Sequence, residues 1–202
     1  MKKKNLIDAI IISTFFFTEE LIFKALINNF TFDYSILRIF LLSAILGLLI
    51  STIANLTNKK KIKMVLILVP CILITIYALA QLGFIAYFGI YMSTNTGGQL
   101  GAVKSYILDF IKSLKPIYYT ILIPIIPLTI YYSLKKVNQE KSSISKKEVF
   151  INLLVLVTLC SSYYATINLK FMQNKYQPIS NKDLFNYPSN PSTTVNQFGI
   201  NG

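Results

Sequence analysis

The stretch "MVLILVPCILITIYALAQLGFIAY", residues 64–87, decides the fold, because it contains no charged side chain. The hydrocarbon core of a bilayer is about 30 Å thick, and a helix of about 20 apolar residues crosses it. Lipid offers no hydrogen-bond partners, so a spanning backbone must pair its own polar groups, as a helix does. Residues 64–87 are therefore predicted to form a membrane-spanning helix.

Four more apolar runs flank this stretch, at residues 6–27, 35–56, 117–134 and 149–169. The chain has 202 residues, of which 53% are hydrophobic, and a soluble domain of this length rarely holds several such runs. We predict an all-α integral membrane protein with five transmembrane helices. Residues 1–169 form the membrane domain, and the polar residues 170–202 form an extended extracellular tail. Pro70, Pro124 and Pro127 are expected to kink the third and fourth spans.

Basic residues indicate how the spans are oriented. Twelve of the 20 Lys and Arg residues fall before the first span, between the second and third, and between the fourth and fifth. Cytoplasmic loops carry this excess in membrane proteins, so we expect a cytoplasmic N-terminus and an extracellular tail in a bacterial cell membrane. The net charge of +12 is thus explained by membrane orientation rather than by nucleic-acid binding.

The loop before the fourth span changes character at residue 102. Its apolar residues recur at helical spacing, at Val103, Tyr106, Ile107, Phe110 and Leu114. This pattern is typical of a short amphipathic helix lying in the outer headgroup layer, where Lys104 and Lys112 would meet lipid phosphates. The alternative is a surface helix that packs against the bundle.

The first two spans contain the charges Glu19, Glu20, Lys24 and Arg38. Ionisable groups inside a membrane cost a few kcal/mol, so they are usually paired or functional. Glu20 and Lys24 are four residues apart and can form an ion pair on one helix face. The four residues are therefore either an outward-facing pocket for a lipid headgroup or an ion cluster that fixes helix packing.

The residues needed for stand-alone catalysis are not gathered anywhere in the sequence. There is no histidine, and the three acids expected to face outward, Asp33, Asp109 and Asp183, lie in separate segments. A hydrolytic or phosphoryl-transfer metal site needs several ligands that converge on one ion. No catalytic residue, metal site or cofactor is expected in this chain.

The closing stretch suggests a family. Its pattern NPS-x3-V-x2-FG comprises Asn190, Pro191 and Ser192, then Val195, then Phe198 and Gly199. Together with five spans, "TEELIFKALI" at residues 18–27 and "YFG" at 87–89, it resembles the membrane portion of the lipoteichoic acid synthase family, which are sulfatase-like phosphoglycerol transferases. The resemblance covers the whole chain with short motifs.

The resemblance implies a five-helix anchor and a linker, followed by an extracellular catalytic domain that uses a threonine and a divalent metal such as Mn²⁺. That domain would move glycerol phosphate from phosphatidylglycerol onto a polymer in cell wall biogenesis. The sequence ends where the domain would begin, so we expect a truncated, non-catalytic anchor that presents lipid substrate. Its expected partners are membrane lipids, phosphatidylglycerol among them, a second copy of the chain or envelope-assembly proteins, and no nucleic acid. The alternative is a complete small membrane protein that binds or regulates an envelope enzyme.

Overall fold

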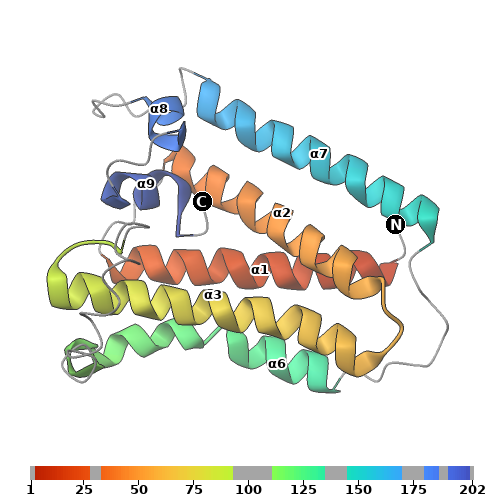
Figure 1. Cartoon of the computed structure of the whole chain (residues 1–202), viewed down its shortest axis with the longest axis horizontal. Coiled ribbons are helices and arrows are strands. Elements are labelled where there is room, and N and C mark those ends of the chain that lie inside the picture. The colour runs from red at the N-terminus through yellow and green to blue at the C-terminus, as the bar shows by residue number, and fades with distance from the viewer. Residues whose placement is uncertain are drawn as a thin grey trace.

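The computed structural model describes residues 3–27, 33–92, 111–134, 145–169, 180–186 and 191–200. All the regular elements within these ranges are helices, and the longest of them run roughly along one common direction (Figure 1). The fold class is therefore all-α, as predicted.

The first three helices run back and forth as an antiparallel set. They are α1 (Lys3–Leu26), α2 (Tyr34–Asn55) and α3 (Lys60–Phe88), and α1 lies against both of the others. The predicted spans 6–27, 35–56 and 64–87 differ from these bounds by a few residues at each end. The α3 helix continues through Pro70.

The fourth run, for which a kink was predicted, is divided into two helical segments. A 3₁₀ helix, η3 (Pro116–Leu122), is followed by a turn at residues 123 and 124 and then by α6 (Ile125–Leu134). Proline lacks the amide hydrogen that a helix interior needs, so Pro124 ends one segment before the next begins. Both pieces lie along α3 and touch α1 (Figure 1).

The fifth run is α7 (Lys146–Asn168), which lies beside α2 at the edge of the bundle (Figure 1). Ser145 caps its start by accepting a hydrogen bond from the Glu148 amide at 3.3 Å, and the Glu148 carboxylate accepts one from the Ser145 amide at 3.1 Å. This reciprocal capping satisfies two amides that a helix start leaves unpaired. It explains why the helix begins three residues before the predicted span.

The tail is not extended in its described parts, so that prediction is wrong for them. It forms α8 (Asn181–Asn186) and α9 (Pro191–Phe198), which lie beside the starting end of α2 (Figure 1). Leu184 and Phe198 bury their side chains with Tyr163 and Ile167 of α7. Tertiary contacts of these two apolar side chains order a segment whose sequence shows no helical period.

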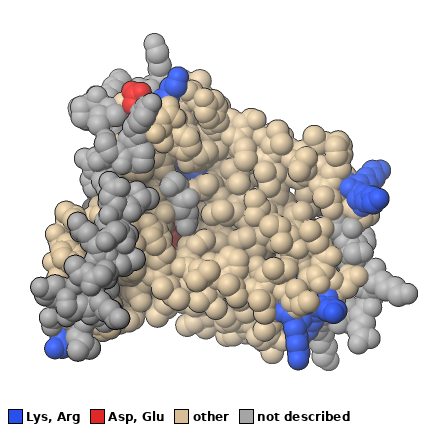
Figure 2. Space-filling model, viewed as in Figure 1, with Lys and Arg blue, Asp and Glu red and all other residues tan. Residues whose placement is uncertain are grey.

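In the part of the chain that the structure describes, four helical segments are long and apolar enough to cross a membrane: α2, α3, the η3–α6 segment and α7. Many large apolar side chains on them are exposed, for example Leu73 and Ile76 on α3 and Phe150 and Leu153 on α7. Figure 2 shows one such face, on which charged atoms lie mainly toward the ends of the long axis and most of the surface between them is uncharged. A lipid environment accounts for this exposure, and the chain is accordingly a membrane protein.

The charged helix α1 is not among these four, but it occupies the centre of the bundle. Its Ile12, Phe15 and Phe16 enter a buried cluster with residues of α2, α3 and α6. Its other half contributes Phe23 to a second cluster, with Leu82 of α3 and Ile121 of η3. The contacts of α1 therefore run along its whole length.

Gly47 allows α1 and α2 to approach closely. A Cβ atom at this position would lie 2.6 Å from the Ser13 amide nitrogen and 2.8 Å from the Ala9 carbonyl oxygen. In lipid, helices associate through close packing rather than through exclusion of apolar surface from water. Small residues at the contact favour this association because they let the two backbones approach closely.

Candidate functional site

Three of the four predicted charges of the first two spans, Glu20, Lys24 and Arg38, lie near one another and near the tail. Like Glu19, they are almost fully buried, with 0 to 2% of their surface exposed. These three residues and Ser35 are called here the tail-side cluster, whereas Glu19 lies beside Thr75 of α3. Because ionisable groups are costly to bury, their contacts decide what the cluster can do.

Lys24 is held by a short chain of polar contacts to the start of α2. Its ammonium donates to the Ser35 hydroxyl at 2.5 Å, and that hydroxyl donates to the Asp33 carboxylate. The same carboxylate accepts a hydrogen bond from the Ser35 amide at 2.9 Å, which caps α2. The cap of α2 therefore also fixes a cation of α1.

Arg38 binds the tail and the end of α7 together. Its guanidinium donates to the Gln197 side-chain oxygen at 2.7 Å and to the Thr166 carbonyl oxygen at 3.2 Å. It also lies 5.6 Å from the centre of the Phe198 ring, within range of a cation–π interaction. A guanidinium suits this position because its planar donors and its flat face can be used at once.

Glu20 binds the tail from the opposite side. Its carboxylate accepts a hydrogen bond from the Ile200 amide at 3.0 Å. Gly199 comes just before, with φ at +84°, and a Cβ atom there would lie 2.7 to 2.9 Å from the Glu20 carboxylate. Glycine meets both requirements of this position, because it adopts a positive φ without strain and has no Cβ atom to collide with the carboxylate.

Residues 195–200, called here the exit segment, thus bind within the tail-side cluster rather than hanging free. Phe198 and Ile200 are 1% and 7% exposed. Ile200 enters the cluster of Phe23 and Leu82, and Phe198 packs edge-on against Phe185 of α8 with ring centres 5.6 Å apart. Two hydrogen bonds and two buried apolar side chains hold it.

Of the other two predicted headgroup residues, the structure describes only Lys112, which is not part of this arrangement. Lys112 lies in a short helical turn before η3 with an exposed side chain, whereas Lys104 lies outside the described residues. Most of the predicted amphipathic helix also lies outside them, so its membrane contact stays a prediction.

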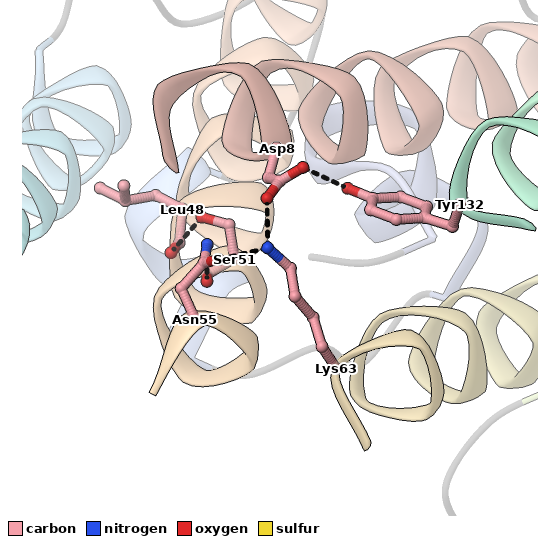
Figure 3. A network of polar contacts seen from close by, with 6 residues as sticks. All are labelled: Asp8, Leu48, Ser51, Asn55, Lys63 and Tyr132. Atoms are coloured by element: carbon pink, nitrogen blue, oxygen red, sulfur yellow. Dashed lines mark hydrogen bonds and ion pairs between the residues drawn. The ribbon is translucent and has the colours of Figure 1, made fainter. Parts of the chain in front are cut away.

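A second polar group, which the sequence analysis missed, lies at the opposite end of α1 (Figure 3). The Asp8 carboxylate forms an ion pair with the Lys63 ammonium at 2.6 Å and accepts a hydrogen bond from the Tyr132 hydroxyl at 3.2 Å. Lys63 also donates to the side-chain oxygen of Asn55. These four residues, called here the N-side cluster, join α1, α2, α3 and α6.

The N-side cluster continues into the end of α2. Asn55 donates to the Ser51 carbonyl oxygen at 2.7 Å, and Ser51 donates to the Leu48 carbonyl oxygen at 3.0 Å (Figure 3). One turn away, Asn152 of α7 donates to Thr52 at 3.0 Å. Polar contacts thus bring all five long segments together at this end.

The sequence carries one signal for this cluster. Asp8 lies at the start of the first apolar run, and Lys63 is one of the basic residues between the second and third runs. An acid at the start of an apolar run needs a partner, and a lysine close to another span end can supply one. Which lysine does so depends on how the helices pack.

The described residues hold no group of three or more His, Cys, Asp or Glu side chains that could bind a metal ion. The donors and acceptors of the tail-side cluster are bonded to other groups of the protein in this structure, among them Ser35, Gln197 and the Ile200 amide.

Comparisons with protein-family models, with curated proteins and with solved structures found no match to this chain.

Proposed function

We propose that this chain is the membrane domain of a lipoteichoic acid synthase-like phosphoglycerol transferase. In this proposal it anchors an extracellular catalytic domain, orients it and presents a lipid substrate to it. The observation that carries the proposal is the binding of the exit segment within the tail-side cluster, through Arg38 and Glu20.

A bound exit segment is what an orienting anchor requires. A flexible linker would let a following domain diffuse over a wide volume, whereas the attachment of residue 200, while the exit segment is bound, defines where the next residue starts. Val195, Phe198 and Gly199, which carry part of the family resemblance, also lie in this segment. Phe198 and Gly199 are buried there, and Val195 packs beside Ile200.

Lys24 and Arg38 are the residues proposed to bind an anionic lipid headgroup. Both sit near the end of the bundle where the tail lies, and both carry donors suited to phosphate oxygens. Lys104 and Lys112 would add contacts with neighbouring lipid phosphates. Phosphatidylglycerol is the lipid that the family resemblance favours.

The proposed orientation places five spans in a bacterial cell membrane, with α1 as the first and the tail outside. The exposed lysines at the starts of α3 and α7, on the end away from the tail, support it. A cysteine-free background, Cys71→Ser with Cys160→Ser, allows single cysteines to be placed at exposed positions. We expect an impermeant maleimide to label K182C in intact cells and K61C only after permeabilisation.

Lipid retention tests the proposed function. We would purify wild-type, Arg38→Gln and Lys24→Gln proteins from bacterial membranes and measure bound phosphatidylglycerol by mass spectrometry. Lys61→Gln, which changes an exposed lysine at the other end, is the matched control. The proposal expects both cluster variants to lose phosphatidylglycerol and the control to keep it.

Three other outcomes would contradict the proposal. Equal phosphatidylglycerol content in all four proteins would exclude a headgroup role for Lys24 and Arg38. Glycerol-phosphate transfer from labelled phosphatidylglycerol by this chain alone would show that it is itself the enzyme. Stable association with an intact envelope enzyme, without lipid retention, would favour the regulator alternative.

A further inference from the structure

The tail-side cluster is closed in this structure, and its cover includes the exit segment. We propose that the exit segment is a detachable cover that competes with a hydroxyl-bearing phosphate headgroup for Arg38 and Glu20. The inference rests on the headgroup role proposed above and adds its regulation.

Burial gives the first step. Arg38 has no exposed surface, and Lys24 and Glu20 keep 1% and 2%. A lipid phosphate cannot reach these groups while they are covered. If the cluster binds a headgroup, a covering element must first move away.

The exit segment is the element suited to move. Glu20 belongs to α1 and Arg38 to α2, and these two long helices pack against each other along their length. By contrast, α9 has eight residues, and a helix that short is marginal without tertiary contacts. Its attachment therefore depends on the contacts of the exit segment with the bundle, and losing them frees it.

The exit segment presents one acceptor and one donor to the cluster. The Gln197 side-chain oxygen accepts from the Arg38 guanidinium at 2.7 Å, and the Ile200 amide donates to the Glu20 carboxylate at 3.0 Å. A phosphoglycerol group offers the same pair, because its phosphate oxygens accept from a guanidinium and its hydroxyls donate to a carboxylate. The two ligands would therefore use the same protein groups.

Electrostatics also favours exchange. Lys24 and Arg38 lie close enough to repel each other. The exit segment gives Arg38 the neutral oxygen of Gln197 and the face of the Phe198 ring but no negative charge, whereas a phosphate between the two cations would add negative charge to that of Asp33 and Glu20. Glu20 in the same cluster disfavours an anion that lacks a hydroxyl donor. The cluster should thus prefer a hydroxylated phosphate ester over inorganic phosphate.

Gly199 provides the variant that releases the cover. Alanine at this position must adopt φ near +84° and must displace the Glu20 carboxylate. Gly89 is the matched control, since its φ is +70° but a Cβ atom there meets nothing within 4 Å. Gly89→Ala therefore introduces the same kind of backbone strain without touching the cluster.

The experiment uses the full chain in phosphatidylcholine nanodiscs. Hydrogen exchange of residues 195–200 reports whether the cover is attached. We expect Gly199→Ala to speed this exchange roughly tenfold or more, since left-handed backbone alone is costly for alanine. Gly89→Ala should leave it unchanged.

Ligand binding is then measured with three probes added to the same nanodiscs: short-chain phosphatidylglycerol, short-chain phosphatidylcholine and inorganic phosphate. We expect Gly199→Ala to bind phosphatidylglycerol several-fold more tightly than wild type, with no gain for the other two. Adding phosphatidylglycerol to the wild-type protein should also speed exchange in the exit segment. The double variant with Arg38→Gln and Gly199→Ala should bind phosphatidylglycerol no more tightly than wild type.

The outcomes separate the two proposals. If Gly199→Ala frees the exit segment and wild type binds phosphatidylglycerol equally well, the cover is wrong and the headgroup role stands. If neither protein prefers phosphatidylglycerol over phosphatidylcholine, the headgroup role fails and the cover fails with it. If exchange in residues 195–200 does not change, the exit segment is not a detachable cover. A gain for inorganic phosphate equal to that for phosphatidylglycerol would contradict the lipid as the competing ligand.

Discussion

The two polar clusters at opposite ends of α1 are built from similar residues but connect different parts of the molecule. In the N-side cluster, Asp8, Asn55, Lys63 and Tyr132 all belong to the long helices of the bundle, and a close ion pair lies at its centre. In the tail-side cluster, Arg38 reaches Gln197, 159 positions further along the chain, and Glu20 reaches Ile200.

This difference indicates two roles. Contacts among side chains of the bundle itself can only fix how those helices pack, so we assign the N-side cluster to stability. Contacts with a short terminal segment can be made and broken while the helices stay in place. Buried polar contacts therefore stabilise helix packing at one end of α1 and attach the tail at the other. Substitutions in each cluster test this difference in role.

The largest loss of stability is expected for Asp8→Asn, which leaves the Lys63 charge largely buried without its carboxylate. Removing one partner of a buried ion pair costs about 3 kcal/mol or more. Thermal unfolding in detergent, followed by circular dichroism, measures this. The double variant with Lys63→Gln should recover part of the loss, and Lys61→Gln is the exposed control. A loss no greater than that of the control would contradict the stability role.

Gly47→Ala should disturb both clusters together. Its Cβ atom would meet the backbone of Ser13 and Ala9, so α1 and α2 must separate. Overpacking of this kind costs about 1–3 kcal/mol. Hydrogen exchange should accelerate around Asp8 and around Glu20, whereas Leu49→Ala on an exposed face of α2 should affect neither. Acceleration at one end alone would show that the two clusters do not depend on the same helix contact.

Gln197→Ala should act locally at the tail. It removes the acceptor that faces the Arg38 guanidinium, and hydrogen bonds to charged groups contribute about 1.5–3 kcal/mol. Exchange of residues 195–200 should rise while the unfolding midpoint of the bundle stays close to that of wild type. Lys182→Ala on α8 is the control. If Gln197→Ala lowered the unfolding midpoint of the bundle as much as Asp8→Asn does, the assignment of different roles to the two clusters would be wrong.

The smallest effect is expected for Tyr132→Phe, which removes one hydrogen bond to Asp8. A neutral donor at 3.2 Å should contribute about 1 kcal/mol. Combining it with Asp8→Asn in a double-mutant cycle should give a total smaller than the sum, because the two residues share one interaction. Tyr119→Phe, at an exposed position, provides the baseline. Strict additivity would mean that the Tyr132 hydroxyl does not act through Asp8.

The helices were predictable because the length and position of each apolar run indicate the length and position of its helix. Residues 64–87 fall inside α3, and the run at 117–134, which was expected to be kinked by its prolines, is interrupted by a turn at Pro124. Glu19, Glu20, Lys24 and Arg38 stood out because a charge within an apolar run is costly wherever it lies. These features depend only on composition along a short stretch of chain.

The tail and the N-side cluster were not predictable in the same way. The tail reads as a polar linker, yet Phe198 buries its side chain against α7 and Ile200 buries its side chain against α1 and α3. Asp8 and Lys63 come from different helices, and nothing local marks them as partners. In both cases the contact joins residues that only packing brings together.

The sequence by itself determined that this is a helical membrane protein, where its apolar helices lie, and which buried charges need partners. It could do so because hydrophobicity, helix length and the cost of a buried charge are local properties. The tertiary structure alone decided that Arg38 and Glu20 hold the exit segment and that Asp8 pairs with Lys63. Hydrogen bonds and ion pairs act over a few ångströms, so their partners are settled by helix packing and not by neighbours in the chain.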